Sequence, residues 1–87
     1  MYAVVVRVNI NDEEGADRAL REQVVPRVSQ SPGFVAGYWT RKDNTGLSMV
    51  IIESEDAANR LGEQVRTMVP EAVTLEGVEV REVVVNA

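Results

Sequence analysis

The sequence predicts an α+β fold with the element order β-α-β-β-α-β, formed by residues 1–87 as one domain. Three observations support this order. Four segments rich in β-branched residues are typical of strands, and two apolar stripes at helical spacing indicate two amphipathic helices. A short polar turn in the middle of the chain predicts that the second and third strands form a hairpin.

The first strand is expected at residues 2–10, where valine is frequent. Side chains alternate between the two faces of a strand. The even-numbered residues of this segment are all apolar, whereas Arg7 and Asn9 make the other face half polar. One face of the strand is therefore expected in the core, and the other is only partly apolar.

A helix should follow, because Asn11–Glu14 supplies a capping residue and acidic side chains for the first turn. Its apolar stripe consists of Ala16, Ala19, Leu20, Val24 and Val28. Pro26 falls inside this stripe, so the helix should either kink there or continue past it as an irregular turn. The Ser-Pro-Gly sequence at 31–33 should end the helix.

The hairpin is expected to join strands at 34–42 and 47–53 through a turn at 43–46, with Gly46 adopting the positive φ. Ser54 is a good N-cap for the second helix, which Pro70 should end. The apolar stripe of this helix consists of Ala57, Ala58, Leu61, Val65, Met68 and Val69. The last strand is expected at 78–85.

This order of elements predicts the ferredoxin-like arrangement, a four-stranded antiparallel sheet with both helices on one face. The other face should then be polar. Instead, residues 4–6, 49–52 and 83–85 are apolar at consecutive positions and hence on both faces. Soluble monomers avoid large exposed apolar patches, so we expect the sheet of a second copy to cover this face and the protein to be a homodimer.

The composition excludes several kinds of chemistry. The chain has no Cys and no His, which removes disulfides, thiolate nucleophiles, imidazole metal ligands and a Ser–His dyad. The formal net charge of −5 argues against a nucleic-acid partner. The acidic run Asp12–Glu14 sits where helix-start acids belong, and we predict no metal site. The sequence contains no membrane-spanning stretch and no signal peptide, so a cytoplasmic protein without membrane contact is expected.

Two segments resemble the dimeric α/β-barrel superfamily, in particular its antibiotic-biosynthesis-monooxygenase-like branch. Residues 31–38, Ser-Pro-Gly-Phe-Val-Ala-Gly-Tyr, lie where that branch has a Pro-Gly-Phe motif leading into the second strand. Residues 53–58, Glu-Ser-Glu-Asp-Ala-Ala, lie where it has a Glu-Ser helix start. The resemblance covers the element order of nearly the whole chain, and its motifs are short and mostly structural.

The resemblance implies a homodimer in which two sheets close a barrel, with a pocket for a hydrophobic small molecule between sheet and helices. Some members of this superfamily oxidise aromatic polyketides without metal or flavin, so no cofactor is predicted. Others degrade haem with an Asn on the first strand, a Trp and a His. Asn9 loosely matches that Asn, but the chain has no His, which argues against haem degradation.

Substrate-binding candidates are Trp39, Arg7, Asn9 and Tyr38, and no catalytic residue is predicted. A regular hairpin would pair Lys42 with Leu47 and Trp39 with Val50. It would also place Trp39 and Tyr38 on opposite faces, with Phe34 on the side of Tyr38.

Each candidate also has a purely structural explanation. Gly37 and Ser48 could leave space for a planar ligand against Trp39, or the indole could simply fill the core or the dimer interface. Arg7 could hold an anion or an enolate oxygen, or pair with a carboxylate across the sheet or the dimer, such as Glu53 or Glu82. These two carboxylates are candidate bases or strand-end residues facing water.

The sequence thus predicts a homodimeric small-molecule-binding protein. Its possible activity is cofactor-independent monooxygenation of an aromatic or polyketide-like substrate. The alternative is a non-catalytic dimer with a ligand-binding, regulatory or assembly role. A pocket beside Trp39 with room for a bicyclic ligand, together with loss of oxygen uptake in Trp39→Ala, would favour the enzyme. Solid packing around Trp39 would argue against both oxygenation and ligand binding.

Overall fold

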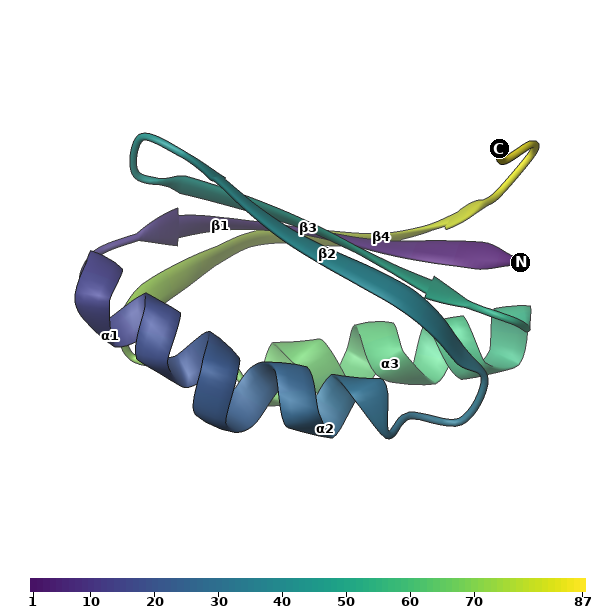
Figure 1. The fold of residues 1–87 in the computed structure, drawn as a ribbon, viewed down its shortest axis with the longest axis horizontal. Helices are drawn as coiled ribbons and strands as arrows, with labels where there is room; N and C mark the ends of the chain where they lie inside the picture. Colours follow the sequence, from purple (N-terminus) through teal and green to yellow (C-terminus); the bar gives the residue numbers. More distant parts are fainter.

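Four antiparallel strands form one sheet in the order β2-β3-β1-β4, and the helices cover one face of it (Figure 1). The computed structural model describes all residues from Met1 to Ala87. Its elements are β1 (Tyr2–Ile10), α1 (Glu13–Ala19), the π-helical turn η1 (Leu20–Val24), α2 (Val25–Ser29), β2 (Phe34–Lys42), β3 (Thr45–Ile52), α3 (Glu55–Thr67) and β4 (Val73–Glu82). The α+β class is confirmed, and the arrangement is compatible with a ferredoxin-like fold.

The first helix passes Pro26 without a break by widening one turn. The backbone N–H of Val25 donates to the carbonyl of Leu20, five residues earlier, so the turn between α1 and α2 is a π turn. Proline has no N–H and cannot donate to the fourth preceding carbonyl, and a π turn absorbs that missing bond. The prediction of an irregular turn at this point is confirmed.

The hairpin differs from the predicted register. Lys42 pairs with Thr45 and Trp39 with Ser48, so the turn has only two residues, Asp43 and Asn44. Asp43 supplies the positive φ of 55°, whereas Gly46, expected to do so, lies inside β3. The register shift is two residues, an even number, so Trp39 keeps the face that was predicted for it.

The last strand begins earlier and ends earlier than predicted. It spans Val73–Glu82, because its only neighbour is β1, and the pairing runs out where Tyr2 meets Glu82. Beyond that point the N–H of Val83 donates to the carbonyl of Met1 at 3.0 Å. Val84 and Val85 are exposed and outside the sheet, so the expectation that residues 83–85 extend its apolar surface is wrong.

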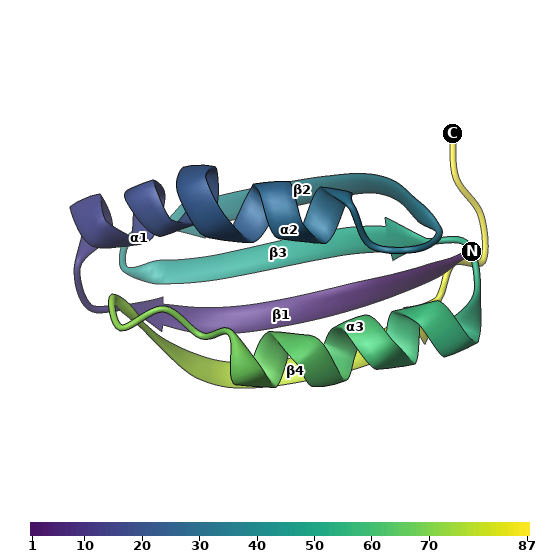
Figure 2. The same ribbon diagram turned by 90° about the horizontal axis from the view of Figure 1, so that it is seen from below.

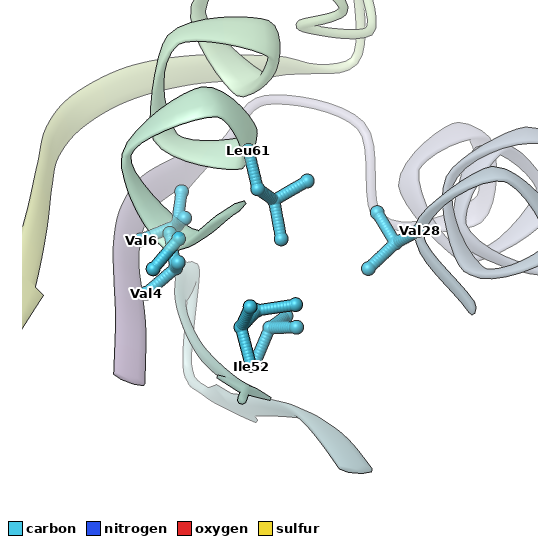
Figure 3. Close-up of a cluster of buried hydrophobic side chains, with 7 residues drawn as sticks. Val4, Val6, Val28, Ile52 and Leu61 are labelled. Carbon is cyan, nitrogen blue, oxygen red and sulfur yellow. The ribbon is translucent and has the colours of Figure 1, made fainter. Parts of the chain in front are cut away.

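The core lies between the sheet and the helices. Figure 3 shows Val28 of α2 and Leu61 of α3 pointing from the helices towards the space that Val4, Val6 and Ile52 of the strands also border. Helix α3 contacts β1, β3 and β4, whereas α2 contacts β2. The segment α1–η1–α2 and helix α3, here called the two helical layers, therefore lie side by side on the same face of the sheet. Each covers a different half of it (Figure 2).

Helix α3 begins as predicted and contains one position that can be improved. The hydroxyl of Ser54 accepts a hydrogen bond from the N–H of Ala57 at 3.2 Å, which caps the helix. Gly62 is buried in the middle of α3 against β4. A Cβ atom built there would lie 3.6 Å from side-chain carbons of Val78 and Val80, an ordinary van der Waals distance.

Gly62→Ala should therefore raise the free energy of unfolding by about 0.5–1 kcal/mol, because alanine is the better helix former and fits the space. Urea unfolding followed by circular dichroism measures this change. Gly33→Ala is the opposite control, since Gly33 has a φ of 78° that strains any side-chain-bearing residue. A Gly62→Ala protein that is less stable than the parent would contradict the prediction.

Candidate functional site

A pocket of about 550 Å³ lies between the helices and the sheet. Of its 24 lining residues, 17 are hydrophobic. They come from all four strands, from both helical layers and from the loop after α3. This volume is within the range of about 300–1,000 Å³ that holds drug-sized ligands, and a mostly apolar lining with few polar groups is typical of such sites.

The pocket adjoins the core and is open where its lining residues are exposed. Val28 and Leu61, which Figure 3 shows facing each other across the helix gap, belong to both the core and the lining. The exposed lining residues that mark the mouth include Arg21, Arg41 and Val69. The space is a consequence of the two helical layers packing on separate halves of the sheet.

Few of the lining residues are polar. They are Asp17, Arg21, Thr40, Arg41 and Ser48. Arg41 donates to Asp17 at 2.6 Å and lies 3.3 Å from the carboxylate of Glu13, so β2 and α1 are joined by an ion-pair cluster at the mouth. The hydroxyl of Thr40 donates to the carbonyl of Leu47 at 2.6 Å.

Trp39 lies in the pocket wall, half-buried against the core. The six-membered part of its indole covers Gly37, because a Cβ atom built on that glycine would lie only 2.7 Å from two ring carbons. The space expected beside Gly37 for a planar ligand is therefore filled by the Trp39 ring itself. Gly37 does not line the pocket, whereas Trp39 and Ser48 do.

Strand β2 has a bulge at its start that changes one predicted position. Phe34 and Ala36 pair with the consecutive residues Ile52 and Ile51, so one extra residue is inserted between them. Phe34 therefore packs against the core on the side of Trp39, and its predicted placement beside Tyr38 is wrong. The bulge precedes Gly37, so Tyr38 and Trp39 remain on opposite faces.

The other three candidates lie on the sheet face away from the helices. Tyr38 is 63% exposed there. The guanidinium of Arg7 donates to Glu79 on β4 at 3.2 Å, so Arg7 pairs with a carboxylate across the sheet, but with neither Glu53 nor Glu82. Asn9 donates to the side chain of Asn11 at 3.1 Å. Of the four predicted residues, only Trp39 lines the pocket.

Sequence analysis did not identify Asp17, Arg21 and Arg41 as part of a site. Asp17 and Arg21 are four residues apart and flank the apolar stripe of the first helix, which is the signal that could have shown them. Arg41 shares a strand face with Trp39, but its contact with Asp17 depends on how the helix lies over β2. No spacing rule within one element shows such a contact.

One titratable side chain, Tyr2 at the start of β1, has a shifted pKa. The pKa of the Tyr2 phenol is raised above its ordinary value, chiefly by the carboxylate of Glu55, then by desolvation, then by Glu82. Glu53 and Glu82 are exposed, as expected for strand-end residues facing water. No group of three or more acidic side chains is placed to hold a metal ion.

No protein-family model matches the chain, and no curated protein sequence matches it either. None of its helices combines the length and the apolar character that a membrane crossing requires.

Proposed function

We propose that the protein is a homodimeric small-molecule-binding protein of the ferredoxin-like, dimeric α/β-barrel type, in which each protomer binds a hydrophobic aromatic compound. The observation that carries this proposal is the pocket of about 550 Å³ with 17 hydrophobic lining residues. This apolar space lies between the helices and the sheet of a chain of only 87 residues. A ligand would supply contacts there, and Trp39 offers it an aromatic ring.

The uncovered face of the sheet supports the dimer. Tyr38, Leu47 and Met49 project from β2 and β3 on the side away from the helices, and all three are exposed. Towards β4 the same face becomes charged, with Glu79 accepting hydrogen bonds from Arg7 at 3.2 Å and from Arg81 at 3.1 Å. A second sheet laid on the apolar half would bury side chains that otherwise face water.

Cofactor-independent oxygenation is the second candidate, implied by the resemblance to the antibiotic-biosynthesis-monooxygenase-like branch. The pocket favours it in one respect, since an apolar chamber keeps water away from a reactive aromatic ring. Such chemistry also needs a base to remove the substrate proton. The only carboxylate in the lining, Asp17, is held by Arg41 at 2.6 Å. Non-catalytic ligand binding is therefore placed first.

Filling the pocket tests the proposal. Ser48 lies beside Trp39 in the wall, and Ser48→Phe should weaken binding of the neutral probe N-phenyl-1-naphthylamine at least tenfold by occupying its space. Probe emission and quenching of Trp39 measure binding. Ser48→Ala is the matched control, because it removes the hydroxyl without filling the pocket, and its affinity should stay within about twofold of the parent.

A thermal melt establishes that the Ser48→Phe protein is folded. Lack of probe binding by the parent chain, or equal binding by the Ser48→Phe protein, would contradict the proposal. Oxygen uptake with anthrone separates the two candidate functions: uptake that the Ser48→Phe change removes supports oxygenation, and binding without uptake supports a non-catalytic protein.

A further inference from the structure

The pocket lining carries three charged side chains, Asp17, Arg21 and Arg41. Two of them satisfy each other, because Arg41 is bound to Asp17 at 2.6 Å and also reaches Glu13 at 3.3 Å. The ion pairs of the chain involve Arg7, Arg41 and Arg81, and none includes Arg21. Arg21 is thus the one lining charge that has no partner within the protein.

Arg21 is also placed where a ligand would end. It is exposed, so it lies at the mouth, while its neighbours Leu20 and Val24 are half-buried in the same wall. All three belong to the π turn η1, and Pro26 follows it in the first turn of α2. Single π turns inside α-helices are frequent at functional sites, and here the turn brings a cation next to apolar lining residues.

Resting on the proposed function, we propose that the ligand is an amphipathic organic acid. Its apolar body fills the pocket against Trp39, and its carboxylate binds the guanidinium of Arg21 at the mouth. A planar guanidinium matches the two oxygens of a carboxylate and forms charge-assisted hydrogen bonds with them. The position at the mouth lets the acid keep part of its hydration, so it avoids the cost of burying an unpaired charge.

Two probes with the same body test the acid, 1-pyrenebutyrate and 1-pyrenebutanol, and their binding is followed by energy transfer from Trp39. The ratio of acid to alcohol affinity should fall about tenfold in Arg21→Gln, with alcohol affinity unchanged. Arg18→Gln is the matched control, since Arg18 lies on α1, is exposed and is outside the lining. It removes the same charge and should leave the ratio unchanged.

The outcomes separate the two proposals. If the ratio stays the same in Arg21→Gln, or falls equally in Arg18→Gln, the proposal of an acidic ligand held by Arg21 is wrong. The proposal of a ligand-binding pocket is then unaffected. If neither pyrene compound binds the parent chain, the proposed function itself fails, and the acid with it. Raising the salt concentration should reduce the affinity of the parent for 1-pyrenebutyrate but not for 1-pyrenebutanol. The reason is that salt screens the pairing between the carboxylate and Arg21 at an exposed mouth.

Discussion

Replacing Ile52 by alanine should lower the free energy of unfolding by about 2–5 kcal/mol, the usual cost of emptying a core position. The side chain is 0% exposed and belongs to the core cluster that Val28 of α2 and Leu61 of α3 cover from the helix side (Figure 3). The pocket already leaves space next to this cluster, and a second void would remove the contacts that hold both helices on the sheet. A small domain has a stability of only about 5–15 kcal/mol, so the loss is a large fraction of the total.

Denaturant unfolding followed by circular dichroism measures the effect. Val84→Ala is the control, because Val84 is 88% exposed and its truncation should change stability by no more than about 0.5 kcal/mol. A loss at Ile52 as small as that at Val84 would show that the helices do not pack on the sheet as described.

Replacing Met49 by glutamate should convert the proposed dimer to a monomer. Met49 lies in the middle of β3, pairs with Val5 and Tyr38 on its two sides, and is 42% exposed in the protomer. A second sheet on this face would bury the new carboxylate among apolar side chains without a partner. The symmetry of a dimer would introduce the charge twice, so the dissociation constant should rise at least a hundredfold.

Sedimentation at micromolar concentration measures the change in assembly. Gln64→Glu adds the same charge on an exposed position of α3, on the helix side of the sheet, and should leave the dimer intact. A parent chain that sediments as a monomer would refute the dimer, and a Met49→Glu protein that stays dimeric would refute this sheet face as its interface.

The elements that sequence analysis placed well depend on local chemistry. Strands β1 and β2 lie where their side-chain alternation predicted, and Ser54 caps α3 through its own hydroxyl. The errors arose where a distant segment decides. The end of β4 is set by the length of β1, and the hairpin closes on Asp43 because aspartate tolerates positive φ well enough to replace glycine.

The candidate site was predicted only in part for a similar reason. Trp39 could be identified because it is the only tryptophan and its face follows from strand periodicity. The roles of Arg21 and Arg41 depend on where the first helix lies above the sheet, which no single element encodes. Gly37 was read as empty space, yet it accommodates the Trp39 ring itself.

The pairing of β1 with β4 has a consequence for biosynthesis. Strand β1 is synthesised before the other three strands and is one of the two central strands of the sheet, and its partners are β3 and a strand that ends only at Glu82. Until residues 73–82 have been synthesised, one edge of an apolar, valine-rich segment has no partner strand. Such long-range pairing slows folding and leaves the nascent chain open to aggregation. The order of the strands therefore makes the chain most prone to aggregate before β4 has been synthesised.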